Sequence, residues 1–107
     1  MKKHEIVKKT QEFQSIIKNK KQLVSSNIIL YYVKSDSFQI GISIPKKFIN
    51  AVGRNYLRRQ IRSIVSGMDY SNINYKVILI IRKDYMKLTY VEKEREIVKF
   101  IERLIKR

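Results

Sequence analysis

The chain has 107 residues, of which 44% are hydrophobic and 31% charged, so its size and composition predict one domain with a modest core. Lys and Arg total 24 against 9 Asp and Glu, which gives a formal net charge of +15 at pH 7. Such an excess repels itself within a small domain. A polyanionic partner, most often a nucleic acid, is the simplest explanation for it.

Several residue types that support catalysis or metal binding are missing or badly placed. There is no cysteine, which excludes a disulfide framework, a thiolate metal site and a thiol nucleophile. The one histidine is His4, close to the N-terminus, so we expect neither a histidine-based zinc site nor a Ser-His-Asp triad. No apolar run approaches the ~20 residues that span a bilayer, and no apolar segment follows the basic N-terminus. We therefore expect a cytoplasmic protein without a metal site of its own.

The first part of the chain predicts one helix followed by three strands. Phe13, Ile16 and Ile17 recur at helical spacing after Thr10, a suitable N-cap, and this helix is expected to run to about Lys18. The strands that follow are rich in β-branched and aromatic residues or alternate between apolar and polar positions. They are expected at 23–24, 28–33 and 39–44.

The second part predicts two helices separated by a buried strand. Asn50 is a suitable cap for a helix that runs to about Ser66, and the continuous apolar run 77–81 is typical of a central strand buried on both faces. Thr89 and Glu92 form a capping box that opens the last helix. Its core stripe is expected to comprise Ile97, Val98, Ile101, Leu104 and Ile105.

These elements follow the order αβββαβα. This order predicts an α/β fold of the α+β sandwich type, in which a small central sheet is packed by helices. We find no linker, repeat or low-complexity segment, so residues 1–107 are expected to form a single RNA-binding domain.

Residues 46–62 are the most informative segment, because they contain six basic residues and no acidic one. Arg54, Arg58 and Arg62 recur every four residues, so they line one ridge of the predicted helix, while the apolar stripe from Leu57 points elsewhere. A solvated basic face is one interpretation. The missing counter-charge and the use of Arg, whose planar fork grips phosphate with two hydrogen bonds, favour a phosphate-binding ridge that faces solvent.

This segment resembles the signature of the bacterial ribonuclease P protein component, and the similarity extends over nearly the whole chain. The core of the resemblance is Asn50-Ala51-Val52-Gly53-Arg54-Asn55, with Lys46-Lys47 before it and Arg58-Arg59 and Arg62 after it. Further similar residues are Phe13-Gln14, Leu30-Tyr31, Gly41-Ile42-Ser43, Arg82-Lys83 and Leu88-Thr89-Tyr90.

The resemblance implies both a fold and a role. Family members contain a βαβ unit with a left-handed crossover, although such crossovers are right-handed in about 98% of proteins. They are subunits of an endonuclease, a ribonucleoprotein that removes the 5′ leader from precursor tRNA in tRNA processing. The catalytic RNA and its bound Mg²⁺ carry out the hydrolysis, so the implied partners are this RNA and precursor tRNA, and the protein chain itself has no catalytic residues.

The resemblance also implies two RNA-binding surfaces. Residues that would contact the catalytic RNA are Lys46, Lys47, Asn50, Arg54, Asn55, Arg58, Arg59 and Arg62. A cleft between the first helix and the sheet would bind the single-stranded leader through Phe13, Ile17, Tyr31 and Arg82.

Three positions depart from the family pattern. Tyr56 stands where a third basic residue is common, so that contact is either lost or replaced by stacking. Ile17 stands where a second cleft aromatic is common, and Asp84 where a proline is common. From composition alone, a free-standing RNA-binding protein of the ribosomal-protein or RNA-chaperone type fits equally well. A nuclease that acts by itself is disfavoured by the missing His and Cys residues and the scattered acids.

Overall fold

The computed structural model describes residues 6, 10–19 and 21–105. The elements are α1 (Thr10–Lys18), β1 (Gln22–Val24), β2 (Ile28–Lys34), β3 (Gln39–Ser43), α2 (Ala51–Ser66), β4 (Tyr75–Ile81), the short 3₁₀ helix η2 (Lys83–Lys87) and α3 (Tyr90–Ile105). The predicted order αβββαβα is therefore confirmed, and η2 is an addition that the sequence pattern did not predict.

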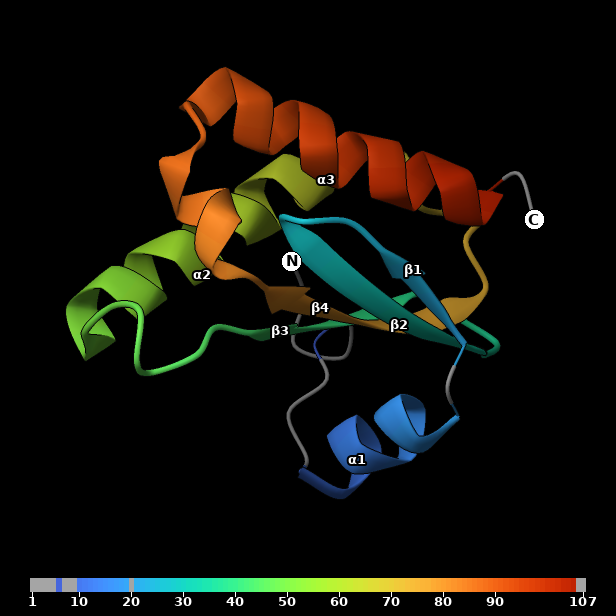
Figure 1. The fold of residues 1–107 in the computed structure, drawn as a ribbon. Helices are drawn as coiled ribbons and strands as arrows, with labels where there is room; N and C mark the ends of the chain where they lie inside the picture. The colour runs from blue at the N-terminus through green and yellow to red at the C-terminus, as the bar shows by residue number, and fades with distance from the viewer. Residues whose placement is uncertain (1–5, 7–9, 20, 106–107) are drawn as a thin grey trace.

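The four strands form one sheet in the order β1-β2-β4-β3. β2 is antiparallel to both of its neighbours, whereas β3 and β4 are parallel. Parallel neighbours cannot be joined by a tight hairpin, and here α2 makes the crossover between them. The left-handed course of this βαβ unit, which the resemblance implied, can be followed in Figure 1.

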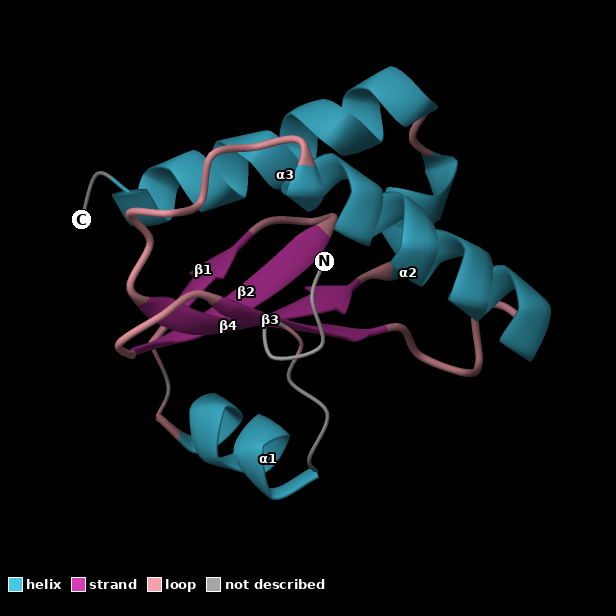
Figure 2. Cartoon of the chain, turned by 180° about the vertical axis from the view of Figure 1, so that it is seen from behind, coloured by secondary structure: helices cyan, strands magenta, loops and turns pink. Residues whose placement is uncertain are grey.

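Helices cover both faces of the sheet, α2 and α3 on one face and α1 on the other (Figures 1 and 2). Alternation along β2 divides its side chains between these two layers. Leu30 and Tyr32 belong to the main core under α2 and α3, whereas Tyr31 and Val33 pack in a smaller cluster under α1.

β4 is the central strand that the apolar run predicted. Val77, Leu79 and Ile81 are fully buried in the main core, and Ile78 is fully buried on the opposite face against Ile16 of α1. The strand is therefore enclosed by helices on both faces and by β2 and β3 on both edges.

The predicted caps of the two long helices are present. Asn50 Oδ1 accepts a hydrogen bond of 2.9 Å from the Gly53 backbone nitrogen at the start of α2. At α3, the Thr89 backbone nitrogen donates to Glu92 Oε1 at 2.9 Å, and the Glu92 nitrogen donates to Thr89 Oγ1 at 3.3 Å. The hydrogen bond that the Glu92 carboxyl accepts from the Thr89 backbone nitrogen lowers the pKa of that carboxyl.

One expected core position of α3 is wrong. Ile105 is 51% exposed, whereas Phe100, which was not in the predicted stripe, is fully buried. The buried positions Ile97, Phe100, Ile101 and Leu104 follow the i, i+3, i+4, i+7 spacing of one helix face. Ile105 lies eight residues after Ile97, so at about 100° per residue it points about 80° away from Ile97 and off the centre of this face.

The sheet approaches α1 closely at Gly41. A Cβ atom at this position would lie 2.6 Å from Phe13 Cζ and 2.7 Å from Ile78 Cδ1. Ile78 is fully buried, so it cannot move aside easily. The absence of a side chain at Gly41 therefore lets the Phe13 ring rest directly on β3.

We expect Gly41→Ala to reduce the free energy of unfolding by about 1–3 kcal/mol, because the added methyl group overpacks the contact with α1. Gly67→Ala is the matched control, since a Cβ there would meet only backbone oxygens at 3.5 Å or beyond. That variant should keep or slightly raise the stability. Urea unfolding of both variants makes the comparison, and equal stabilities would contradict the close approach of Phe13 to β3.

Candidate RNA interface

The ends of three strands meet at one edge of the sheet and form a groove there. Parallel β3 and β4 both end at this edge, and antiparallel β2 begins there. The hollow has a volume of about 340 Å³, and we call it the sheet-edge groove. It is lined by Ser26, Ile29, Pro45, Lys47, Phe48, Ile80, Ile81, Arg82, Lys83 and Asp84.

The sheet-edge groove combines an apolar floor with walls in which three cationic side chains outnumber the single carboxylate of Asp84. Ile29 and Ile80 are register partners on β2 and β4 and supply apolar surface from the sheet. Lys47, Arg82 and Lys83 are exposed, and they come from the segments that follow β3 and β4. Such a combination suits a single-stranded nucleic acid, whose bases need apolar contact and whose phosphates need positive charge.

Arg82 is held in place by the loop between β1 and β2. Its Nη1 donates a hydrogen bond of 3.1 Å to the Ser25 backbone oxygen, and its backbone nitrogen donates to the Asn27 oxygen at 2.9 Å. The η2 helix begins directly after it, with Tyr85 buried beneath. Burial also raises the pKa of the Tyr85 hydroxyl. The segment that contains Asp84 is therefore a 3₁₀ turn anchored by a core tyrosine.

A second hollow of about 590 Å³ continues the groove toward η2. It shares Lys47, Phe48 and Lys83 with the sheet-edge groove and adds Met86 and Lys87. The Lys47 Nζ atom lies 5.3 Å from the centre of the Phe48 ring, so charge and aromatic surface are adjacent here. Sequence reasoning missed Phe48, Met86 and Lys87. No local pattern pointed to these residues, because the 3₁₀ helix that carries two of them is too short to show a period.

Of the four residues predicted to form the leader cleft, only Arg82 lines the sheet-edge groove. Phe13 and Tyr31 are half-buried and pack beside Ile16 and Ile78 under α1. Tyr31 lies on the same face of β2 as Ile29, two residues along, which places it next to the groove floor. Ile17 is half-buried on α1. The structure thus brings Arg82 and Lys47 to the same groove. Sequence analysis had predicted different RNAs for them, the leader for Arg82 and the catalytic RNA for Lys47.

The arginine ridge of α2 is less exposed than the sequence predicted. Arg54, Arg58 and Arg62 are half-buried, whereas Arg59 is exposed. Residues four apart on a helix are offset by about 40°, so the ridge drifts along the border of the buried face. The Arg54 Nη1 atom donates a hydrogen bond of 2.9 Å to the Ile49 backbone oxygen. This side chain therefore also holds the segment before α2 in place.

A third hollow, of about 490 Å³, lies on the outer side of α2, and we call it the arginine hollow. It is lined by Val52, Asn55, Tyr56, Arg58, Arg59 and Arg62. Arg58 Nη1 donates a hydrogen bond of 3.2 Å to Asn55 Oδ1, which fixes both side chains. The predicted contacts Asn55, Arg58, Arg59 and Arg62 are therefore brought together here.

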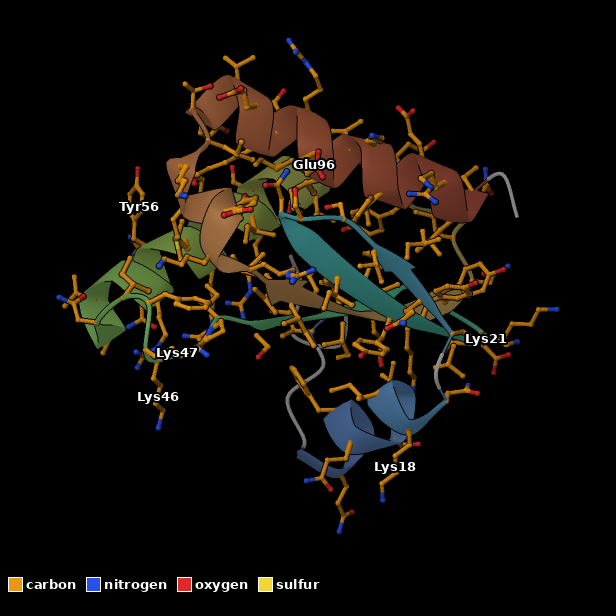
Figure 3. The ribbon with its side chains drawn as sticks, in the orientation of Figure 1. Lys18, Lys21, Lys46, Lys47, Tyr56 and Glu96 are labelled. Atoms are coloured by element: carbon orange, nitrogen blue, oxygen red, sulfur yellow. The ribbon has the colours of Figure 1, made fainter. Side chains whose placement is uncertain are left out.

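The remaining predicted contacts lie at the start of α2. Lys46 and Lys47 project from the segment before the helix, on the other side of α2 from Tyr56 (Figure 3). Asn50 is exposed, but its side-chain oxygen is already engaged by the Gly53 nitrogen. Asn50 therefore caps α2 through its side-chain oxygen, and its side-chain NH₂ group is the part that could donate a hydrogen bond to RNA.

The described residues contain no group of three or more His, Cys, Asp or Glu side chains that could hold a metal ion. Glu96 makes a structural contact, because its Oε1 atom accepts a hydrogen bond of 2.9 Å from Ser25 Oγ. No helix within the described residues has the length and apolar character needed to cross a membrane.

Comparisons with known proteins show the family to which the chain belongs. The sequence model of the family described as Ribonuclease P matches residues 1–105. The chain is 58% identical over 104 residues to the ribonuclease P protein component of Mycoplasma mobile, covering 97% of this chain and 93% of that protein. The chain belongs to the ribonuclease P protein component family. It is thus a protein subunit of the endoribonuclease ribonuclease P, which acts in tRNA processing.

Other relatives support both sequence and fold. The ribonuclease P protein component of Mycoplasmopsis pulmonis is 47% identical, covering 96% of this chain and 94% of that protein. The ribonuclease P protein of Staphylococcus aureus superposes with a TM-score of 0.81 at 27% identity, covering 95% of each chain. That of Thermotoga maritima, at 21% identity, shares the fold with a TM-score of 0.80 and covers 92% of this chain and 96% of its own.

We expect Asn50→Ala to lower the free energy of unfolding by about 1 kcal/mol, because the Gly53 nitrogen loses its acceptor. Asn50→Ser, which can accept the same hydrogen bond, should restore most of the loss. Thermal and urea unfolding measure both effects. If the alanine and serine variants are equally stable, Asn50 does not hold α2 by capping.

Proposed function

We propose that this ribonuclease P subunit binds two RNAs at once. The exposed side of α2 binds the catalytic RNA, and the sheet-edge groove binds the single-stranded 5′ leader of precursor tRNA. By holding the leader beside the RNA's active centre, the protein assists endonucleolytic cleavage that yields the mature 5′ end. The observation that carries this proposal is the meeting of Lys47, Arg82 and Lys83 over the apolar floor of the groove.

The groove suits a leader because it offers no pattern of base-specific donors and acceptors. Its floor is aliphatic, and its cations come from long side chains that follow a backbone rather than read a base. Leaders differ in sequence between tRNAs, so a sequence-tolerant site serves them all. The adjoining hollow adds Lys87, whose Nζ atom lies 3.7 Å from Asp84 Oδ1 in an exposed ion pair, so a phosphate bound there would compete with that carboxylate.

The α2 surface suits a structured RNA because its cations are held at fixed spacing. Residues 46–62 contain no acidic residue, so no ion pair within this segment competes for the arginines. Two of them make hydrogen bonds that orient the guanidinium groups, Arg54 to Ile49 and Arg58 to Asn55. Pre-oriented forks lose less entropy when they grip phosphates.

Hydrolysis itself belongs to the RNA in this proposal. Magnesium ions would supply the activated water and stabilise the leaving oxygen. The described residues contain no acidic cluster that fits such an ion, so in this proposal Mg²⁺ is held mainly by the catalytic RNA and the substrate. We also propose a cytoplasmic location, because precursor tRNA is the substrate in this proposal.

Removing one exposed cation from each surface should affect different binding steps. Lys47→Ala should weaken the binding of precursor tRNA roughly tenfold, because a charge-assisted contact is worth about 1.5 kcal/mol. Mature tRNA lacks a leader, and its binding should be unchanged. Arg59→Ala should weaken assembly with the catalytic RNA by a similar factor and leave the ratio of the two tRNA affinities unchanged.

The measurement is the affinity for precursor and mature tRNA at saturating ribonuclease P RNA, together with the affinity of each variant for that RNA. The unmodified protein is the positive control and should restore cleavage of precursor tRNA at low Mg²⁺. A free-standing RNA-binding protein would bind these RNAs without restoring cleavage. If Lys47→Ala lowers both tRNA affinities equally, the sheet-edge groove does not hold the leader.

A further inference from the structure

An aromatic side chain stands exposed among the arginines of α2. Tyr56 is 62% exposed, and Val52, one helical turn earlier, is 78% exposed. Single exposed apolar residues are ordinary on protein surfaces. These two are neighbours at i, i+4 spacing, however, and both line the arginine hollow.

The surroundings of Tyr56 determine what could cover it. Arg58, Arg59 and Arg62 line the same hollow as the ring, together with the polar Asn55. The Arg62 Nε nitrogen is buried and has no hydrogen-bond partner among the described residues. The ring offers a flat apolar surface and the three arginines offer positive charge, so a base with the phosphates on either side of it fits this hollow.

The proposal rests on the proposed function, in which α2 binds the catalytic RNA. We propose that the Tyr56 ring stacks on an unpaired base of this RNA, while Arg58, Arg59 and Arg62 hold the phosphates on either side of that base. Paired RNA presents phosphates and hydroxyl groups outward and keeps its base faces covered, so a ring on this helix finds a free base face only where pairing is interrupted.

The position of the ring separates this contact from the leader site. Tyr56 projects from α2 on the side away from Lys46 and Lys47, as Figure 3 shows, and it does not line the sheet-edge groove. A base stacked on Tyr56 therefore belongs to a different strand segment from the one in the groove.

Salt dependence distinguishes stacking from phosphate binding. Each phosphate contact releases counterions and steepens the dependence of affinity on salt, whereas a stacked base does not. We expect Tyr56→Ala to weaken binding to the catalytic RNA about 5- to 150-fold at every salt concentration, with the slope unchanged. Arg59→Ala should reduce the slope of log affinity against log salt by about 1.

The experiment measures binding of the ribonuclease P RNA of Mycoplasma mobile to the full chain at four salt concentrations. Tyr56→Phe keeps the ring and should bind like the unmodified protein. Tyr56→Leu keeps apolar bulk without the ring and should lose affinity as the alanine variant does. Tyr90→Ala removes another exposed aromatic, which lies outside the hollow, and should have no effect.

Three results would overturn the stacking contact. They are a Tyr56→Ala affinity within twofold of the unmodified protein, a loss in Tyr56→Phe equal to that in Tyr56→Ala, and a reduced salt slope in Tyr56→Ala. If the unmodified protein itself fails to bind the RNA, the proposed function fails instead. Because Tyr56 is exposed, thermal melting of the variants should match that of the unmodified protein.

Discussion

The parallel pairing of β3 with β4 is the constraint on which the candidate interface depends. Five register pairs, from Gln39 with Lys76 to Ser43 with Ile80, fix the two strands side by side in the same direction. Their carboxyl ends must then lie at one edge of the sheet, and the residues after each strand must meet there. Lys47 and Arg82, 35 positions apart in sequence, share a groove for this reason.

The same pairing determines where α2 lies. A parallel neighbour requires a crossover, and the crossover helix must bury one side against the sheet. Leu57, Ile61, Ile64 and Val65 form that side and are all buried. Like charges at i, i+4 cost an isolated helix a few tenths of a kcal/mol per pair, so packing of the apolar side is what allows the outer side to remain cationic.

The local features of the fold could be predicted from the sequence, because each depends on neighbouring residues. Asn50 and the pair Thr89 and Glu92 make the expected capping hydrogen bonds, and the run 77–81 is the buried central strand. η2 was not predicted, since one turn of 3₁₀ helix carries too few residues to show a period. It depends on burial of Tyr85, which no local pattern reveals.

The candidate site could be predicted only in part. The arginine series of α2 follows from spacing, but the half-burial of Arg54, Arg58 and Arg62 depends on how the helix rotates against the sheet. The sequence places Lys47 next to Lys46 and predicted that both contact the catalytic RNA. Only the strand topology shows that Lys47 and Arg82 line the same groove. The place of Phe13 depends on the missing side chain at Gly41, a contact between distant parts of the chain.

If the sheet-edge groove and the outer side of α2 contact different RNAs, site-directed cleavage from one position on each surface should cut different RNAs. The chain has no cysteine, so a single introduced cysteine can carry an iron chelate that cuts nearby RNA. Lys83 lines the groove, and Ser63 is exposed on α2. In the assembled holoenzyme with precursor tRNA, we expect Lys83→Cys to direct cuts to the 5′ leader and Ser63→Cys to direct cuts to the catalytic RNA. Cuts in the same RNA from both positions would contradict the account.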